Sequence, residues 1–325
     1  MHVLLVNQAP IPAFAYGGTE RVIWDLGRAL TELGHQVTYL VPQGSSCPFA
    51  HVLPIDPTQP IESQIPQFVD LVHFQFKPEH PDRITKPWLM TQHGNSDVGQ
   101  MLPHNTVFVS HNHAQRHGSD CFVLNGLDWR TYGAVNFNAP QSYFHFLGKA
   151  AWRVKNVQGA IDVAIKAGKT LKVLGGHRLN IKRGFRLTLS PHIHFYGMVG
   201  GDQKIHLLQQ SSGLIFPVRW HEPFGLAVIE SLYYGCPVFA TPYGSLPELV
   251  DPENGVLCTN IQELAHAVKE FVPNRHRNHE KARDLFNAQR MAKDYLNVYQ
   301  KLMNGDSLNQ AAPFMPNTAV ALAWS

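Results

Sequence analysis

Short apolar runs rich in branched residues alternate along the chain with segments whose apolar residues recur at helical spacing. The clearest helix is Gly18–Gly34, in which Val22, Leu26 and Leu30 line one face and Gly34 is placed to end it. Continuous apolar strands joined by crossover helices indicate a parallel sheet that is covered on both faces. The strands predicted for the first part of the chain are Val3–Val6, Gln36–Val41, Val69–Phe74, Trp88–Thr91, Thr106–Val109 and Phe122–Leu124.

The same alternation restarts after about residue 140, with Val157–Ala167 as its clearest helix. Two α/β halves predict two Rossmann-like domains with a cleft between them. Neither half contains the G-x-G-x-x-G fingerprint of dinucleotide binding, which argues against a dehydrogenase. The strands predicted for this part are Tyr143–Leu147, Leu171–Leu174, His194–Tyr196, Gly213–Pro217 and Pro237–Ala240.

The end of the chain combines a helical stretch with an apolar tail. Asn274–Met303 predicts one or two helices, and Ala311–Ser325 is either a docked arm or a disordered end. The predicted organisation is therefore an N-terminal domain 1–140, a second domain 141–290, and a C-terminal helix and tail 291–325. The candidate apolar contacts of the helical stretch are Leu285, Met291, Tyr295, Tyr299 and Leu302.

Charge and cysteine usage narrow the classes of function. The 325 residues carry a net charge of only +3, which is not typical of a nucleic-acid-binding protein. Residues 1–140 have a net charge of −4 and residues 141–325 a net charge of +7, so we expect the second part to hold any anionic ligand. Four scattered cysteines, no apolar run of membrane-spanning length and no basic, apolar leader favour a cytoplasmic protein.

The segment with the most specific chemistry is Phe216–Glu230. A strand ends at Phe216, a loop carries Glu222, and a helix is predicted to start at Phe224, where unpaired N–H groups favour a phosphate. Glu222 and Glu230 are eight residues apart, a helical spacing of roughly 12 Å, which suits contact with a sugar and with a nucleoside ribose. In the alternative interpretation Glu222 only caps the helix and Glu230 is an exposed helix residue.

This segment resembles the signature of retaining glycosyltransferases of the GT-B class, family 4, with its Glu-Pro-Phe-Gly and Glu-x7-Glu pattern. Gly235-Cys-Pro237, Gly244-Ser-Leu-Pro-Glu248 and Asn254-Gly255 are similar to the segments that come after that signature in the family. The resemblance extends over residues 1 to about 303, with several motifs in the family's order. It implies a GT-B fold, in which two Rossmann-like domains face each other across a central cleft and the C-terminal helix crosses back to the N-terminal domain.

The resemblance also implies the site residues. Glu222 would bind donor hydroxyls, Glu230 the ribose hydroxyls, and His93 the acceptor side or the primary hydroxyl of the donor sugar. Asn125–Asp128 resembles a turn before the interdomain linker and is expected to be mainly structural. The residues expected to act in catalysis are His93, Lys155 and Glu222, and those expected to bind the donor are Gly17, Gly18, Lys149, Lys155, Glu222, Phe224, Gly225, Leu226 and Glu230.

The diphosphate-binding pair departs from the family pattern. Lys149 stands where arginine is commoner, and Asn156 replaces the usual glycine after Lys155, so the geometry of the grip differs while its charge is kept. Trp152 and Arg153 lie between the two lysines and are further candidates to face the cleft. No Asp-x-Asp element is present, and two lysines with a helix N-terminus are able to supply the positive charge. We therefore expect a metal-independent enzyme with no cofactor.

The resemblance implies transfer of a hexose-type sugar from a nucleoside diphosphate sugar, with UDP as the expected carrier, to a hydroxyl acceptor. A front-face mechanism is expected because no carboxylate obviously serves as a nucleophile. The alternatives are a non-catalytic sugar-nucleotide-binding subunit and a sugar-nucleotide epimerase. Since residues 1–140 are acidic and lack a basic amphipathic helix, a small-molecule or glycan acceptor and no stable membrane anchoring are expected, with no nucleic-acid partner.

Two further clusters have competing interpretations. The histidines favour surface or capping roles over a metal site because no cysteine or carboxylate is patterned with them. A cluster of four basic residues favours a solvated loop over a nucleobase or partner contact. The histidines are His111, His113, His117, His192 and His194, and the basic cluster is Arg178, Lys182, Arg183 and Arg186.

Overall fold

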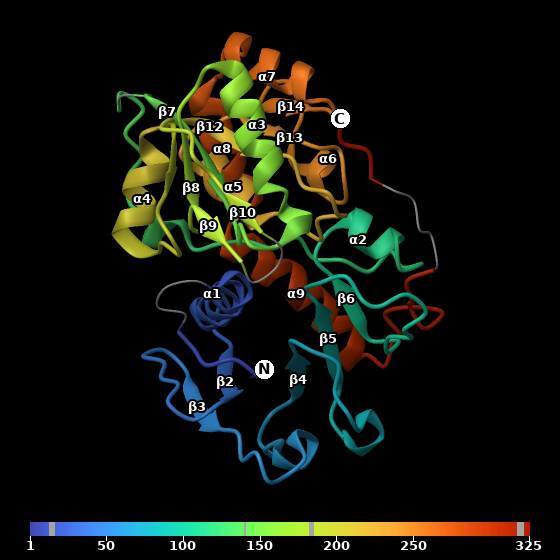
Figure 1. Ribbon diagram of the computed structural model, residues 1–325. Coiled ribbons are helices and arrows are strands. Elements are labelled where there is room, and N and C mark those ends of the chain that lie inside the picture. Colours follow the sequence, from blue (N-terminus) through green and yellow to red (C-terminus); the bar gives the residue numbers. More distant parts are fainter. Residues whose placement is uncertain (13–16, 140, 182–184, 317–321) are drawn as a thin grey trace. The chain divides into compact units, whose positions relative to one another are not determined.

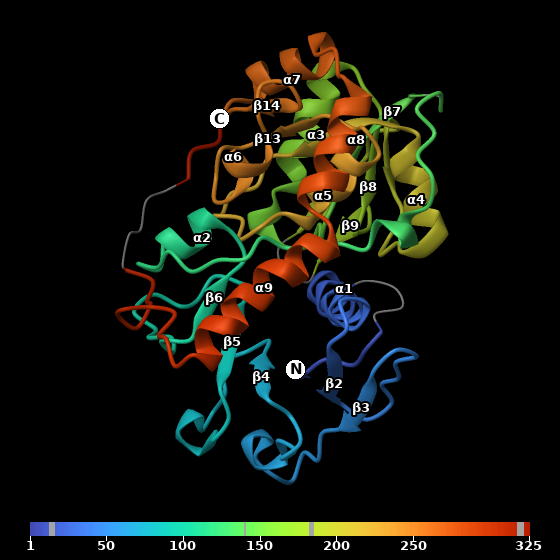
Figure 2. The same cartoon turned by 180° about the vertical axis from the view of Figure 1, so that it is seen from behind.

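The computed structural model describes residues 1–12, 17–139, 141–181, 185–316 and 322–325. The chain divides into two compact units, each containing a parallel sheet built from six of the strands described (Figures 1 and 2). The units divide at residues 129/130 and 285/286. The boundaries predicted from the sequence are 140/141 and 290/291. Of the described residues, unit 1 comprises 1–12, 17–129 and 286–316, and unit 2 comprises 130–139, 141–181, 185–285 and 322–325.

The sheet of unit 1 has the strand order β3-β2-β1-β4-β5-β6, with every neighbouring pair parallel. Val3 of the central strand pairs with Val37 on one side and Leu71 on the other, and its side chain is completely buried. Such two-sided burial is why these strands consist of continuous apolar runs. The strands are β1 (His2–Val6), β2 (Gln36–Val41), β3 (His51–Pro54), β4 (Leu71–Phe74), β5 (Trp88–Gln92) and β6 (Thr106–Phe108).

One predicted strand of this unit is wrong. Phe122–Leu124 forms no strand, and its ladder pairing is a single bridge between Phe122 and Phe108. Three residues are too few to show a period, so the apolar run alone did not separate a strand from a buried loop. The helices of unit 1 are α1 (Gly18–Glu32), α2 (His111–Gln115) and α9 (Ala288–Met303), with short 3₁₀ turns at Ile61–Gln64, Pro81–Arg83 and Trp129–Tyr132, the last spanning the boundary of the units.

The stretch 274–303 forms two helices, α8 (Arg275–Leu285) in unit 2 and α9 in unit 1. The chain thus returns to the N-terminal unit, where α9 packs beside α1 (Figure 2). Four of the five predicted apolar contacts are buried, whereas Leu285 is half exposed at the end of α8. The prediction for Leu285 is wrong because the helix ends there and the chain leaves the apolar face.

The turn Asn125–Asp128 holds the start of α9 by backbone hydrogen bonds. The Leu127 amide donates to the Phe286 carbonyl at 3.0 Å, and the Ala288 amide donates to the Leu127 carbonyl at 3.0 Å. A Cβ at Gly126 would lie 2.1 Å from the carbonyl oxygen of Asn287, so only glycine allows this approach. The contacts described agree with the expected structural role of this turn.

The sheet of unit 2 has the order β11-β8-β7-β12-β13-β14, again parallel throughout. Helix α3 lies on the face toward the viewer in Figure 1, and α5 and α8 lie on the opposite face, seen in Figure 2. A small antiparallel hairpin, β9–β10, follows β8. The strands are β7 (Tyr143–Leu147), β8 (Leu171–Leu174), β9 (Leu179–Asn180), β10 (Arg186–Leu187), β11 (Ile193–Phe195), β12 (Ser211–Phe216), β13 (Val238–Ala240) and β14 (Gly255–Leu257).

The helices of this unit are α3 (Val157–Ala167), α4 (Gly201–Gln209), α5 (Leu226–Tyr233), α6 (Leu246–Leu249), α7 (Ile261–Glu270) and α8, with a 3₁₀ turn at Arg153–Lys155. Among the described residues, no helix combines the length and the hydropathy needed to cross a bilayer.

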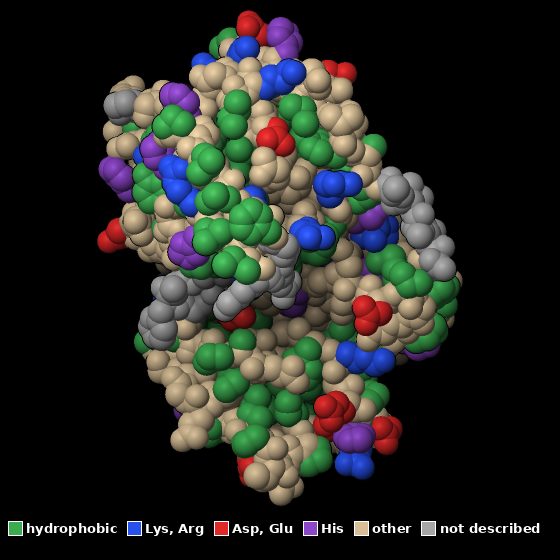
Figure 3. Space-filling view, in the orientation of Figure 1, with side chains coloured by type: hydrophobic (Ala, Val, Ile, Leu, Met, Phe, Trp, Pro, Cys, Tyr) green, Lys and Arg blue, Asp and Glu red, His purple; other side chains and the backbone are tan. Residues whose placement is uncertain are grey.

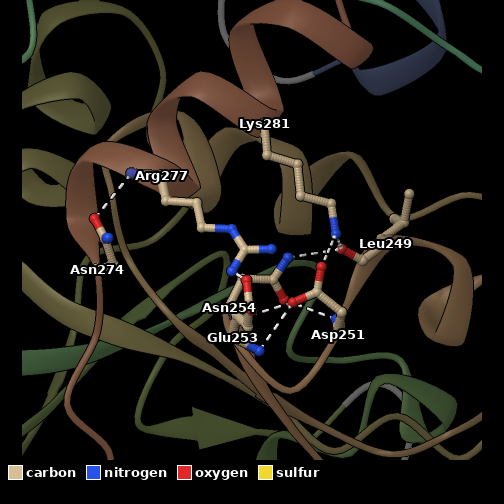
Figure 4. Close-up of polar contacts among 7 residues, drawn as sticks. All are labelled: Leu249, Asp251, Glu253, Asn254, Asn274, Arg277 and Lys281. Atoms are coloured by element: carbon tan, nitrogen blue, oxygen red, sulfur yellow. Dashed lines mark hydrogen bonds and ion pairs between the residues drawn. The ribbon is translucent and has the colours of Figure 1, made fainter.

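A polar cluster ties α8 to the loop between α6 and β14 (Figure 4). The Asp251 carboxylate accepts the amides of Glu253 and Asn254 at 2.9 and 3.1 Å. Lys281 of α8 donates to the other Asp251 oxygen at 2.8 Å and to the Leu249 carbonyl at 2.9 Å. The Asn254-Gly255 motif therefore belongs to a structural turn that fixes α8.

Those parts of the tail that the structure describes are docked. The Pro313 carbonyl accepts the Leu102 amide at 2.8 Å, and the Met315 carbonyl accepts the Gly99 amide at 2.8 Å in unit 1. In unit 2, Ser325 exchanges backbone hydrogen bonds with Thr259 and Ile261. These contacts support a docked arm rather than a disordered end for residues 311–316 and 322–325.

Candidate functional site

The strand order of unit 2 reverses between its two central strands, β7 and β12. In an open α/β sheet, ligands bind beyond the carboxyl ends of the strands at such a switch point. The segment after β7 carries Lys149 and Lys155, and the segment after β12 carries Glu222. The topology therefore brings predicted site residues from two distant parts of the chain to one edge of the sheet.

Lys155 and Glu222 form an ion pair at this edge, with the Lys155 Nζ atom 2.7 Å from the Glu222 Oε2 atom. The indole N–H of Trp220 donates to the same oxygen at 2.8 Å. The Lys155 ammonium also lies 4.5 Å from the centroid of the Trp220 ring, within cation–π range. No described residue donates to Glu222 Oε1, which leaves that oxygen to accept a hydroxyl of a ligand.

The loop that carries Glu222 is fixed by the segment after β13. A Cβ at Gly244 would lie 2.3 Å from the Glu222 nitrogen and oxygen, and its φ is +68°, so the close approach requires glycine. The Ser245 amide donates to the Glu222 carbonyl at 2.9 Å, and the Ser245 hydroxyl donates to the Phe224 carbonyl at 2.5 Å. The Gly244-Ser245 motif thus positions the carboxylate, which explains in physical terms why it accompanies Glu222.

Helix α5 begins at Leu226, two residues later than the sequence predicts, with Gly225 as its N-cap at φ +103°. Phe224 is buried before the helix. The first amides of the helix, at Leu226 and Ala227, have no acceptor within the helix and point toward its N-terminal end. Since Glu222 precedes the helix, the helical spacing of roughly 12 Å to Glu230 does not describe their separation.

Glu230 lies within α5 and is only 2% exposed, which excludes the interpretation that it is an exposed helix residue. Lys204 of α4 donates to Glu230 Oε1 at 2.5 Å, and the Tyr132 hydroxyl donates to the same oxygen at 2.6 Å. A buried carboxylate needs such partners because desolvation of an unpaired charge is costly. Lys204 and Tyr132 are site residues that the sequence analysis missed.

The conformation of the segment after β7 explains why Asn156 replaces the usual glycine. Asn156 has φ +52°, and it is the one described residue other than glycine with a left-handed backbone. Asparagine tolerates this conformation, and here its side chain accepts the Gly159 amide at 3.1 Å and donates to the Pro217 carbonyl at 2.8 Å. The residue thus caps α3 and joins the two site segments. Lys149 is exposed, 5.2 Å from the Trp152 ring centroid.

The remaining predicted residues belong to unit 1. Gly17 is the N-cap of α1 and Gly18 its first residue, so both lie where the helix offers unpaired amides. His93 follows β5, and its Nε2 atom lies 2.8 Å from Gln75 Oε1, just beyond β4. Strand order reverses between β1 and β4, so these residues also lie at the carboxyl edge near a switch point. The predicted site residues form two groups, each within its own unit.

Burial lowers the pKa of His93 to about 4, and that of the neighbouring His73 to about 3. His93 is therefore neutral near pH 7, and because Nε2 faces an amide oxygen it carries the proton, leaving Nδ1 as an acceptor. The ring is suited to accept a hydroxyl proton or to orient a hydroxyl, and not to act as a cation.

We expect the His93 ring resonances to stay constant in an NMR titration from about pH 8 to pH 5 and to shift near pH 4. Between pH 6.5 and about pH 4, His93 is protonated in the unfolded chain but neutral in the folded protein. The free energy of unfolding therefore falls as the pH is lowered from 6.5 toward 4. His93→Gln identifies the resonance and removes this part of the pH dependence. Titration of the ring near pH 6.5 would show that the site is open to water.

Side chains of the histidine cluster and of the basic cluster form hydrogen bonds within the protein. His113 Nε2 faces the Gly94 carbonyl at 3.1 Å, and His117 Nε2 faces the Ser96 hydroxyl at 2.9 Å. Within the described ranges, no group of three or more His, Cys, Asp or Glu side chains is arranged to hold a metal ion. Arg178 and Arg186 brace the β9–β10 hairpin, and Lys182 and Arg183 lie outside the described residues.

Comparisons with known proteins bear on the fold and on residues 135–290. Residues 135–290 match the family model described as Glycosyl transferases group 1. The structure is similar to AviGT4, a glycosyltransferase involved in avilamycin A biosynthesis, with a TM-score of 0.76 and 21% identity over 94% of this chain and 99% of that one. Sucrose-phosphate synthase from Thermosynechococcus elongatus gives a TM-score of 0.71 at 17% identity, covering 94% and 100% of the two chains.

The chain has the GT-B fold. The residues that match the group 1 model, 135–290, include Lys155, Glu222 and Glu230. A curated relative, the GDP-mannose-dependent alpha-(1-6)-phosphatidylinositol dimannoside mannosyltransferase of Mycobacterium tuberculosis, is 32% identical over 109 residues. That match spans 32% of this chain and 29% of the relative.

Proposed function

We propose that this protein is a retaining glycosyltransferase of family 4, which moves a hexose-type sugar from a nucleoside diphosphate sugar to a hydroxyl acceptor. The observation that carries the proposal is the cluster of Lys155, Glu222 and Trp220 at the switch point of the unit 2 sheet, inside the matched domain. It combines a cation for a leaving phosphate with a carboxylate for sugar hydroxyls. A GT-B fold with this cluster supports transfer more directly than epimerisation.

The reaction moves negative charge onto the leaving diphosphate while the sugar becomes cationic. In the proposed roles Lys149, Lys155 and the first amides of α5 stabilise the leaving group by preorganised electrostatics. Glu222 accepts donor hydroxyls through Oε1, and its other oxygen stays fixed by Lys155 and Trp220. Lys204 and Tyr132 hold Glu230 in position for the ribose hydroxyls.

We assign His93 to the acceptor side. The diphosphate is assigned to Gly17 and Gly18. We propose a front-face path, in which the C–O bond to the diphosphate breaks and the acceptor oxygen bonds to the anomeric carbon on the same face. The acceptor proton passes to the departing diphosphate oxygen. The lysines supply the positive charge, so the proposed reaction needs neither a metal nor another cofactor.

UDP is the proposed carrier. A structural neighbour, the Anabaena protein Alr3699/HepE, was crystallised in complex with UDP and glucose, and it has a TM-score of 0.66 with 14% identity, covering 92% of this chain and 99% of that one. The mycobacterial relative is named as GDP-mannose-dependent, so GDP is the competing base.

A thermal-shift experiment tests the donor site. We expect millimolar UDP to raise the Tm of the protein by about 2–5 °C, with and without a chelator, and GDP and ADP to raise it less. Lys155→Met is expected to lose most of this shift, measured against its own Tm, whereas Lys166→Met, an exposed change on α3, keeps it. A larger shift with GDP would replace UDP as the base, and no shift with any nucleotide would contradict the donor site.

A further inference from the structure

The β9–β10 hairpin of unit 2 exposes an unusual set of large apolar side chains. Leu179 and Leu187 face each other across the two strands, so they lie on one side of the hairpin. Figure 3 shows hydrophobic side chains gathered over the position that β9 and β10 have in Figure 1. The apolar hairpin patch consists of Leu179 (48% exposed), Ile181 (70%), Phe185 (77%), Leu187 (51%) and Leu189 (81%).

Single exposed apolar residues are ordinary on protein surfaces, but a contiguous group marks a site of interaction. All five side chains of the patch come from residues 179–189. Among the described residues, these side chains remain between 48% and 81% exposed, so they gain little folding energy from packing. Their exposure therefore needs a role outside the packing of the unit.

Arginines brace the base of the hairpin. The Arg178 guanidinium donates to the carbonyls of Thr188, Ser190 and Ile193 at 3.1, 3.1 and 2.6 Å. The Arg186 guanidinium donates to the Thr188 hydroxyl at 3.0 Å and to the His177 carbonyl at 2.9 Å. The patch is thus presented on a fixed support.

The charge of the sequence around the hairpin is of one sign. Residues 163–201 contain seven Lys or Arg residues and no Asp or Glu. Among the described residues, the hydrogen-bond partners of Arg178 and Arg186 are carbonyl and hydroxyl oxygens, so no carboxylate neutralises these guanidinium groups. The apolar patch therefore belongs to a basic stretch of the chain and has two guanidinium groups at its base, a charge that complements an anionic surface.

We propose that the apolar hairpin patch docks on an anionic lipid bilayer. Apolar side chains enter the boundary between headgroups and acyl chains, while nearby cations attract the anionic headgroups. A nucleic acid would use the charge but leave the aliphatic side chains in water. A stable protein partner needs about 800 Å² on each side, more than one short hairpin offers.

This docking is reversible surface binding, and it differs from the stable anchoring that the charge of residues 1–140 argues against. The acidic charge is a property of residues 1–140, whereas the hairpin belongs to unit 2. The proposal does not depend on the proposed sugar transfer, because membrane binding is measured without any nucleotide.

Vesicle flotation of the full chain tests the proposal. We expect binding to phosphatidylcholine vesicles that contain phosphatidylglycerol, little binding to phosphatidylcholine alone, and release at high salt. The double variant Phe185→Ser/Leu189→Ser is expected to bind at least about tenfold more weakly, because two inserted side chains lose their apolar surface. Val272→Ser removes a side chain that is 89% exposed outside the patch, and it should leave binding unchanged.

The Tm and the nucleotide-induced shift of the double variant provide the folding control and should match wild type. Phe185→Leu keeps an apolar side chain and should keep most of the vesicle binding. No binding of wild type to anionic vesicles, or equal binding of the double variant, would overturn the proposal. So would a wild-type dimer that the double variant converts to a monomer without any effect of vesicles.

Discussion

Lys155→Met is expected to lower the rate of donor turnover by about a hundredfold to a thousandfold. The ammonium group stabilises the charge that develops on the leaving diphosphate, and a low-dielectric site makes such a charge more effective than it is in water. The same change leaves Glu222, which is buried, without its ion-pair partner at 2.7 Å. The measurement is hydrolysis of the stabilising sugar nucleotide without acceptor, which requires no knowledge of the acceptor.

Matched variants separate charge from position. Lys155→Arg keeps the cation and should recover part of the activity, although its planar fork differs in shape. Trp220→Phe keeps a ring near Lys155 but removes the indole donor to Glu222, and we expect a loss of about tenfold. Wild-type turnover in both Lys155→Met and Trp220→Phe would show that this cluster is structural and that the donor phosphate binds elsewhere.

The strands of both sheets were predictable wherever they are buried on both faces, as in β1, β2, β7 and β8. The sequence analysis missed β3, whose residues are only partly buried or exposed, and β14, which is three residues long. Neither has the continuous apolar run that identifies a central parallel strand. Phe122–Leu124 has such a run, but its pairing with β6 stops at the single bridge to Phe108, and the extent of pairing depends on tertiary position.

The residues of the candidate site were likewise predictable only where a local motif contains them. Lys155 and Glu222 were found because each belongs to a local motif, and the structure pairs them. Trp220 lies two residues from Glu222, but its indole contact depends on the loop conformation. Lys204 and Tyr132 are 26 and 98 residues from Glu230, so no local spacing links them. Only the position of Lys204, in helical register with the buried Leu207 and Leu208, is a signal of burial in the sequence.

The pair of Lys204 and Glu230 gives the largest expected effect on stability. Lys204 is 8% exposed and Glu230 is 2% exposed, and their charged atoms are 2.5 Å apart. Lys204→Met is expected to lower the free energy of unfolding by about 3 kcal/mol, because it leaves a buried carboxylate with one fewer donor. Urea denaturation of the two proteins at the same pH measures this loss.

The double variant Lys204→Met/Glu230→Gln distinguishes an unpaired charge from lost packing. Glutamine is neutral and its carbonyl oxygen can still accept the Tyr132 hydroxyl, so we expect this protein to recover most of the stability that Lys204→Met loses. Lys166→Met, at an exposed position of α3, should change the free energy of unfolding by less than about 0.5 kcal/mol. If Glu230 also holds the ribose, the double variant will regain stability without regaining the nucleotide-induced shift in Tm. Full recovery of both would remove Glu230 from the donor site and leave it a purely structural carboxylate.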